Sequence, residues 1–253
     1  MSTVTRPLMV YLPDTRGVRV SHYGKGNLKI GPNTFTYSRM PGRVHERAIG
    51  SEDALVSSTG TCPGATDECL AICYARRVVQ ENGAVAEMWL NNSITDEVPE
   101  IPADARLLRI HIGGDFDCVE YINNWVQRLQ ERPDVTAWVY TRSWRVPALL
   151  EALEGLRALD NVQCFASMDL STVEMPPEGW RIAWIDGDPR AGKAHRIFAH
   201  TPEAESMKAW DLQLTEAGTK ALICPEETKA VDSCEQCGFC FHGVRNDVVF
   251  LRH

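Results

Sequence analysis

The sequence predicts an α/β protein with a parallel sheet arranged as an open or partial (β/α) barrel. From residue 106 onward, short apolar runs alternate with amphipathic stretches of helical period. Strands that alternate with helices lie parallel, because each helix carries the chain back to the start of the next strand. A doubly wound sheet is the main alternative. The expected strands are residues 34–40, 107–112, 136–141, 162–168, 181–186, 196–200 and 221–224.

The stretches between the strands predict helices. Residues 68–91 form a long helical stretch with a break near Asn82-Gly83, a pair that commonly ends a helix. Asp117 stands where an N-cap is expected, and Glu120 completes a capping box three residues later. Two helices are expected from apolar residues that recur on one face. In the first helix these residues are Tyr121, Ile122, Trp125, Val126 and Leu129, and in the second they are Val146, Leu149, Leu150, Leu153 and Leu156.

The length and charge narrow the class of protein. The chain has 253 residues, 26 of them basic and 34 acidic, for a formal charge of −8. This acidic balance, with no basic stripe, does not indicate nucleic-acid binding. No stretch approaches the roughly 20 apolar residues of a membrane span. We expect a single domain, residues 1–253, made of an N-terminal part (1–100), βα units (101–215) and a cysteine-rich C-terminal extension (216–253).

Nine cysteines are the unusual feature of the composition. An odd number excludes complete internal disulfide pairing, and a chain of this length can build a core without disulfides. The N-terminal segment has no long apolar run and no small-residue cleavage site, so we expect a cytoplasmic protein with reduced cysteines. Clustered reduced cysteines are typical of metal sites.

The C-terminal cysteines give the strongest signal in the sequence. Cys224, Cys234, Cys237 and Cys240 have the spacing C-x9-C-x2-C-x2-C. A mononuclear zinc site usually uses two well-separated Cys-x2-Cys pairs. A continuous Cys-x2-Cys-x2-Cys run resembles the ligand pattern of bacterial [4Fe-4S] ferredoxins, with Cys224-Pro225 as the source of the fourth ligand. The spacing therefore favours an iron–sulfur cluster, with zinc as the alternative.

A second group consists of Cys62, Cys69 and Cys73, with the spacing C-x6-C-x3-C. Cys69 and Cys73 are four residues apart, so we expect both to point from one face of a helix. Three thiolates leave one position of a metal or cluster open for a substrate or cofactor. Ligands from both groups could also share one cluster. The alternative is that one of the three fills the core. Cys118 and Cys164 are expected core residues.

Other candidate residues lie at the carboxyl ends of the expected strands, where parallel α/β folds carry their sites. Gly113, Gly114 and Asp115 form a turn that lets a ligand approach the backbone, and the carboxylate could hold an ammonium group. The alternative is that the glycines only make the turn and that Asp115 or Asp117 caps the helix. Two residues at the next strand ends, Arg142 and Asp169, are candidates for polar contacts with a ligand.

Together, the three-cysteine loop, the Gly-Gly-Asp turn and the βα units resemble the radical S-adenosylmethionine superfamily. The resemblance implies a partial (β/α) barrel and a [4Fe-4S] cluster with one open iron on Cys62, Cys69 and Cys73. It also implies that Gly113, Gly114 and Asp115 receive the methionine amino group, and that the C-terminal cysteines hold an auxiliary cluster. The usual loop has the spacing C-x3-C-x2-C, which differs from the spacing here.

A closer resemblance covers most of the chain. The segments GNLKIGPNTFTYSR, TCPG with CYA, RIHIGGDF, YTRSW and the final Cys-x2-Cys-x2-Cys are similar to the gene-product-eighty-eight family of bacteriophage proteins. This resemblance implies a phage or prophage origin, and therefore the cytoplasm of an infected host cell. It implies no particular activity.

These observations support three hypotheses. The first is a phage iron–sulfur protein with one or two [4Fe-4S] clusters, which would bind S-adenosylmethionine at an open iron if it is an enzyme. The second is a scaffold without catalysis, stabilised by clusters or zinc, that binds a host protein. The third, a zinc-dependent nucleic-acid enzyme, is disfavoured by the acidic charge and by the lack of a His/Glu metal motif on a helix.

Overall fold

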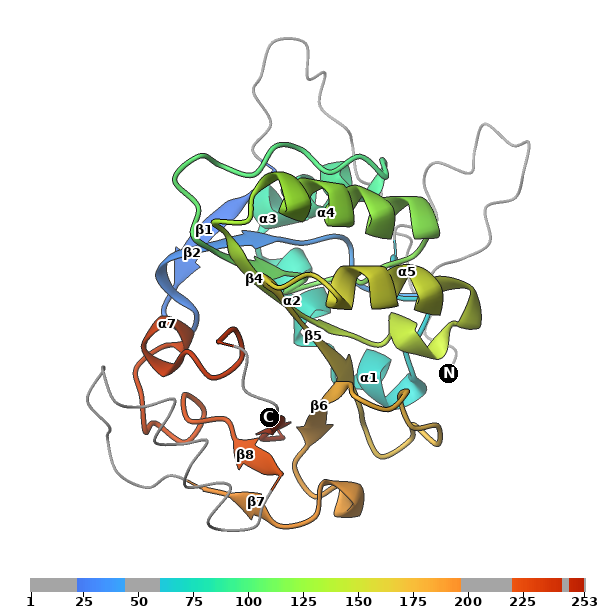
Figure 1. The fold of residues 1–253 in the computed structure, drawn as a ribbon, viewed down its shortest axis with the longest axis vertical. Coiled ribbons are helices and arrows are strands. Elements are labelled where there is room, and N and C mark those ends of the chain that lie inside the picture. The colour runs from blue at the N-terminus through green and yellow to red at the C-terminus, as the bar shows by residue number, and fades with distance from the viewer. Residues whose placement is uncertain (1–21, 44–59, 197–219, 243–245, 253) are drawn as a thin grey trace, which may run out of the picture.

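The computed structural model describes residues 22–43, 60–196, 220–242 and 246–252. Its centre is one nine-stranded sheet of order β1-β2-β3-β4-β5-β6-β9-β8-β7 (Figure 1). The strands are β1 (Gly24–Asn27), β2 (Gly31–Tyr37), β3 (Leu107–Ile110), β4 (Thr136–Thr141), β5 (Val162–Ser167), β6 (Arg181–Ile185), β7 (Ala194–His195), β8 (Ala221–Ile223) and β9 (Asp247–Phe250). The α-helices are α1 (Asp67–Ala71), α2 (Tyr74–Glu81), α3 (Gly83–Ser93), α4 (Val119–Glu131), α5 (Pro147–Arg157) and α7 (Cys234–Cys237), with two short 3-10 helices, η2 (Ser143–Arg145) and η3 (Pro189–Ala191).

The sheet consists of a run of strands in chain order, followed by C-terminal strands in reversed order. Strands β2 to β6 are parallel neighbours in chain order, whereas β1 pairs antiparallel with β2. Beyond β6 the order reverses, because β9 lies between β6 and β8 and β7 forms the edge. The α/β class expected from the sequence is therefore confirmed as a mixed, mostly parallel sheet. The last strand of the described chain inserts beside β6 and brings the C-terminal segment onto the sheet.

The two faces of the sheet have different coverings. Along β4, Ala137 and Val139 join the main core with helices α4 and α5, whereas Trp138 and Tyr140 point to the opposite face. Figure 1 shows α4 and α5 on one side of the sheet and the C-terminal segment with α7 on the other. The second core on that side contains Phe165, Ala183, Leu222, Cys224, Ala230, Val231, Cys237, Phe239 and Val248. We call this side the inner face.

Most of the expected strands are present. The strand expected at 136–141 has the same bounds in the structure, and those expected at 107–112, 162–168 and 181–186 end one or two residues earlier. Of the strand expected at 196–200, residues 197–200 lie outside the described part of the chain; the described strand next to it is β7, Ala194–His195. Strands β1 and β9 were not expected. Both are four residues long, and β1 contains two glycines, so neither has a strong pattern.

The expected helix at 68–91 is three helices. The break at Asn82 is confirmed: this residue ends α2, and its side chain accepts a hydrogen bond from Val85 N at the start of α3. A second break at Ile72–Cys73 was not expected. Among the described helices, none has the length and apolar character needed to cross a membrane.

The predicted cap of helix α4 is also wrong. The N-cap is Cys118, whose sulfur accepts a hydrogen bond from Tyr121 N at 3.5 Å. Asp117 forms an ion pair of 2.5 Å with Arg39 instead, and this arginine side chain is only 1% exposed. A buried guanidinium needs a carboxylate partner more than a helix end needs a charged cap, because an unpaired buried charge costs several kcal/mol. The tertiary partner therefore decides the role of Asp117.

Candidate metal centres

The N-terminal cysteines lie on the loop and helices that follow β2. Cys62 N donates to Gly42 O at 2.8 Å, and Thr66 caps α1 by accepting a hydrogen bond from Cys69 N at 3.0 Å. Helix α1 ends at Ala71, and Cys73 is the N-cap of the next helix. The expectation that Cys69 and Cys73 share one helical face is therefore wrong, because the chain bends between them.

The structure nevertheless brings the three thiols together. Burial raises the pKa of Cys62, and the nearby charges of Asp115, Cys69 and Cys73 raise it as well. Burial also raises the pKa of Cys69, whereas the positive charge of Arg142 and a hydrogen bond from it lower that pKa. The thiols interact with one another, so adding a cation or a cationic cluster would relieve the cost of ionising them. These three residues form the three-cysteine site.

A glycine lets this loop lie directly on the sheet. A Cβ at Gly64 would come within 2.0 Å of the backbone oxygen of Arg142, a separation that a real Cβ contact does not show. Arg145 Nη1 donates to Gly64 O at 2.9 Å from the same turn. The loop is thus fixed on the carboxyl end of β4, as the βα architecture predicts for a functional site.

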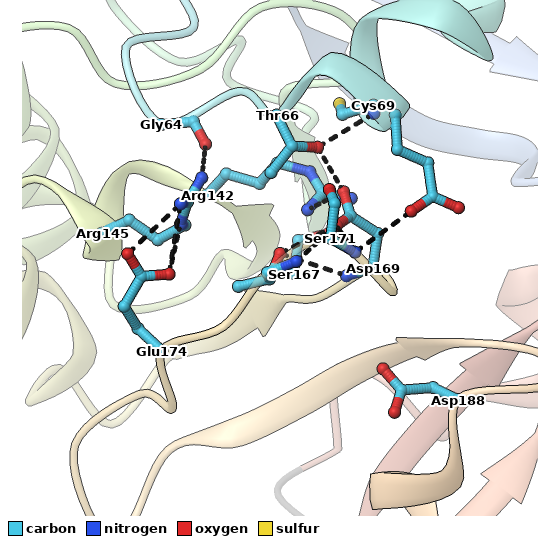
Figure 2. A network of polar contacts seen from close by, with 12 residues as sticks. Gly64, Thr66, Cys69, Arg142, Arg145, Ser167, Asp169, Ser171, Glu174 and Asp188 are labelled. Atoms are coloured by element: carbon cyan, nitrogen blue, oxygen red, sulfur yellow. Dashed lines mark hydrogen bonds and ion pairs between the residues drawn. The ribbon is translucent and has the colours of Figure 1, made fainter.

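Arg142 and Asp169 contact each other beside the three-cysteine site (Figure 2). Arg142 Nη1 lies 2.8 Å from Asp169 Oδ2, and Thr66 donates a hydrogen bond of 2.5 Å to the same oxygen. Although burial acts against the charged form, the hydrogen bond from Thr66 and the charge of Arg142 keep the pKa of Asp169 below its usual value. The two candidate ligand contacts are therefore already partners, and Arg142 lies between Asp169 and Cys69.

The Gly-Gly-Asp turn lies against the same loop. A Cβ at Gly113 would come within 2.3 Å of the ring of Trp89, and one at Gly114 within 2.7 Å of Arg39 O. Gly114 also has φ +77°, a region that favours glycine. Asp115 N donates a hydrogen bond of 3.1 Å to Oγ1 of Thr61, the residue that precedes Cys62 in the sequence. The two glycines are thus needed for the close packing of this turn.

The carboxylate of Asp115 is buried and fully engaged. Its oxygens accept hydrogen bonds from Thr141 Oγ1 at 2.6 Å, Arg142 N at 2.7 Å and Phe116 N at 2.8 Å. Burial raises its pKa to about 6, although these hydrogen bonds act in the opposite direction. In this structure, Asp115 ties the ends of β3 and β4 together and lies beside the three-cysteine site.

The C-terminal cysteines gather on the inner face of the sheet. Cys224 follows β8 and donates from its backbone N to Val249 O at 2.8 Å, while Cys234 N donates to Lys29 O at 2.8 Å. Burial raises the pKa of all four thiols; the charge of Cys240 raises the pKa of the other three further, and Cys234 also raises those of Cys224 and Cys237. The cysteine charges that raise the pKa of Cys224, Cys234 and Cys237 all come from this group. We call Cys224, Cys234, Cys237 and Cys240 the four-cysteine site.

Three cations and three aromatic rings line the four-cysteine site. Tyr140 lies between two rings, with centroid distances of 4.9 Å to Phe165 and 5.1 Å to Phe250. Each ring carries one cation at the distance given from its centroid: Arg109 over Tyr140 at 3.9 Å, Arg181 over Phe165 at 4.1 Å and Lys29 over Phe250 at 5.9 Å. Burial raises the pKa of Cys240, and all three cations together with the Tyr140 hydroxyl oppose that rise.

Sequence reasoning missed these cations. Arg109 alternates with the buried residues Leu108 and Ile110 on β3, so its side chain is on the opposite face from theirs. Arg181 is the first residue of β6 and is itself buried, whereas the next residue, Ile182, belongs to the main core on the opposite face. A charged residue within an apolar strand could have indicated a site on that face of the sheet. The sequence does not show which residues it would contact, because they come from another part of the chain.

The remaining cysteine and histidine candidates lie in the core or pack against it, outside the two cysteine sites. Cys164 is buried in the main core, as expected, whereas Cys118 is half-buried at the start of α4. His111 is fully enclosed and its Nε2 lies 2.8 Å from the Tyr121 hydroxyl. Metal-binding atoms of Asp96, Asp117 and Cys118 lie within 4.8 Å of one another, but the guanidinium of Arg39 is the cation that pairs with both carboxylates.

Comparison with known proteins identifies the family. A family described as Gene product 88 matches residues 37–243 of the chain. The chain belongs to this family. It is similar to the Gene 88 protein of Mycobacterium phage L5, with 29% identity over 230 residues, covering 78% of this chain and 85% of that protein. The Gene 88 protein of Mycobacterium phage D29 is 28% identical over 227 residues, covering 80% and 87%.

The expected phage family is therefore confirmed. The matched segment contains both cysteine sites, the Gly-Gly-Asp turn and strands β3 to β6. No solved structure matches the chain. The family match and the two relatives carry no link to the radical S-adenosylmethionine superfamily, so that resemblance rests on the residues alone.

Proposed function

We propose that this member of the Gene product 88 family is an iron–sulfur protein. The observation that carries the proposal is the four-cysteine site, in which thiols on the inner face are surrounded by Lys29, Arg109 and Arg181. A [4Fe-4S] cluster held by four thiolates is a buried anion, and buried anions need compensating cations. The residues present fit such a group in both donor chemistry and charge. Cys224, Cys234, Cys237 and Cys240 would hold it.

The spacing of the sulfurs favours a cluster over a single zinc ion. Zinc with four thiolate ligands at about 2.3 Å places the sulfurs about 3.8 Å apart, as tetrahedral geometry requires. Within the described residues, no three of the four sulfurs all lie within 4.8 Å of one another. A centre with several metal ions spans a wider set of ligands than a single ion does. Zinc remains the alternative that metal analysis tests.

The three-cysteine site would hold a second cluster. Its three thiols leave one metal position without a protein ligand, and Asp115 of the Gly-Gly-Asp turn lies close enough to raise the pKa of Cys62. This proximity and the chain-order parallel strands β2 to β6 support a partial barrel of the radical S-adenosylmethionine type. The hydrogen bonds on Asp115 already use its carboxylate, so a bound amino group would need acceptors besides it.

The competing proposal is a scaffold stabilised by its metal centres, which binds a host protein and catalyses nothing. Among the residues that the structure describes, eight large apolar side chains are exposed, and Ile72, Leu170, Val173 and Met175 are among them. Ser171 N donates to Glu68 Oε2 at 3.2 Å, so the loop that carries Leu170 and Val173 lies beside α1 of the three-cysteine site. An apolar rim of this kind is compatible with a protein partner as well as with a substrate.

The test is anaerobic reconstitution of the full chain, followed by analysis of iron, acid-labile sulfide and zinc. We expect iron and sulfide in the wild type. Changing Cys224, Cys234, Cys237 and Cys240 together to Ser should remove one cluster, and the same change at Cys62, Cys69 and Cys73 should remove the other. Cys118→Ala and Cys164→Ala are matched controls that should keep full iron. Zinc without sulfide would overturn the proposal.

The enzyme and scaffold proposals make different predictions for the metal position of the three-cysteine site that has no protein ligand. Adding S-adenosylmethionine to the reduced protein should shift the electron paramagnetic resonance signal of the three-cysteine site if that position binds it. The variant with Ser at Cys62, Cys69 and Cys73 should show no shift. Intact clusters in the wild type with an unchanged signal would favour the scaffold.

A further inference from the structure

Arg109 differs from the other two cations of the four-cysteine site in its partners. Lys29 is paired with carboxylates, 3.5 Å from Glu226 and 2.7 Å from Glu227. Arg181 donates to the carbonyl oxygens of Phe239 and Cys240 and to the side chain of Gln163. Among the described residues, no carboxylate forms an ion pair with Arg109. Its charge therefore lacks the compensation that Lys29 receives.

The position of Arg109 makes this lack of compensation costly. The side chain is half-buried on the inner face, and its Nε is buried with no hydrogen-bond partner among the described residues. Nη2 donates to His111 O at 3.3 Å, and the guanidinium stacks on Tyr140. A buried donor that lacks a partner is destabilising, and more so when it is charged. The arrangement is explained if an anion compensates this charge.

A cluster held by the four-cysteine site would supply that anion. The ring of Tyr140, whose centroid lies 3.9 Å from the Arg109 guanidinium carbon, packs together with Cys240 against the second core of the inner face. Tyr140, on which Arg109 stacks, acts on the sulfur of Cys240 as a hydrogen-bond donor. Arg109 and Tyr140 come from β3 and β4, which are adjacent strands of the rigid sheet, so their positions do not depend on a loop.

We propose that Arg109 and Tyr140 set the reduction potential of the cluster in the four-cysteine site, Arg109 as its counter-cation and Tyr140 as a hydrogen-bond donor to Cys240. The inference rests on the proposed function. A reduced cluster carries one more negative charge than the oxidised one, so a nearby cation and a donor to sulfur stabilise the reduced state. Removing either should make the potential more negative.

The experiment measures the midpoint potential by redox titration followed by electron paramagnetic resonance. The full chain is used with Ser at Cys62, Cys69 and Cys73, so that only the four-cysteine site holds a cluster. Arg109→Gln removes the charge, and Arg109→Lys keeps it. Tyr140→Phe keeps the ring under Arg109 and removes only the hydroxyl. Arg106→Gln is the matched control, because Arg106 lies one residue before β3, is 65% exposed and pairs with Asp134.

We expect Arg109→Gln and Tyr140→Phe to shift the potential to more negative values, Arg109→Lys to shift it less than Arg109→Gln, and Arg106→Gln to leave it unchanged. A potential for Arg109→Gln equal to that for Arg106→Gln would overturn the role of Arg109. If Arg109→Gln holds no cluster, Tyr140→Phe decides, since it preserves the packing, and an unchanged potential there would overturn the proposal. Absence of iron and sulfide from the parent protein would overturn the proposed function as well.

Discussion

The hydroxyl of Thr66 donates a 2.5 Å hydrogen bond to Oδ2 of Asp169, which lies 103 residues further along the chain. The same hydroxyl accepts from Cys69 N and caps α1. One side chain thus starts the helix that carries Cys69 and fastens it to the end of β5. Asp169 is fully buried, so its carboxylate depends on this donor, on Arg142 and on neighbours in its own turn.

Thr66→Ala should lower the stability of the protein. The change removes a helix cap, worth about 1 kcal/mol, and leaves a buried acceptor with one donor fewer, which costs about 1–3 kcal/mol. Thr66→Ser keeps the hydroxyl and should lose less than half as much. Urea denaturation of the metal-free chains measures both. Equal stability of the Ala and Ser variants would contradict the role of the hydroxyl.

Gly64→Ala should displace the three-cysteine loop. The new Cβ would lie 2.0 Å from the backbone oxygen of Arg142, and neither backbone segment can move without breaking its hydrogen bonds. We expect a clear loss of thermal stability and a lower iron content at this site. Gly155→Ala is the control, because nothing lies within 4 Å of its Cβ position in α5. That variant should gain about 0.5–1 kcal/mol.

Arg39→Met should be strongly destabilising. The change leaves Asp117 without its ion-pair partner and next to the like charge of Asp96, and breaking a buried pair typically costs about 3–5 kcal/mol. Arg43→Met is the matched control, since its partner Asp67 is 91% exposed, and it should cause a much smaller change. Chemical denaturation compares the two, and similar losses would contradict this account of Asp117.

His111 should make stability depend on pH. Burial, followed by the charges of Arg39 and Arg109, holds its pKa well below the usual value of about 6.5. Below about pH 6.5 the unfolded chain therefore binds a proton at this residue, whereas the folded chain does not. The contribution of His111 to the free energy of unfolding is complete above that pH and falls by up to about 1.4 kcal/mol per pH unit below it.

The comparison uses His111→Asn, because His111 has φ 60° and asparagine tolerates that region. The variant should be less stable than the wild type at pH 7.5, since the contacts with Phe116 and Tyr121 are lost. The difference in unfolding free energy should narrow at pH 5.5, because only the wild type loses stability there through this residue. Asp115 titrates near the same pH but is common to both proteins. A constant difference would contradict the shift.

Local patterns predicted the elements that lie within one segment. Strand β4 and helix α5 were expected almost to the residue, because alternation and helical period depend on neighbours in sequence. The same logic failed between Glu68 and Asn91, where one helical period hides the break at Ile72–Cys73. It also failed at Asp117, which pairs with Arg39 rather than capping the helix.

The sequence alone determined the α/β class, the phage family and the two cysteine groups, since spacing and composition are local properties. Only the tertiary structure decided that the two groups form separate sites, that Gly64 seats one loop on Arg142, and that Lys29, Arg109 and Arg181 surround the other site. These contacts join residues from distant strands. Their energies depend on burial and on the order of the strands in the sheet. That order reverses after β6, and it is set by pairing between strands that are far apart in sequence.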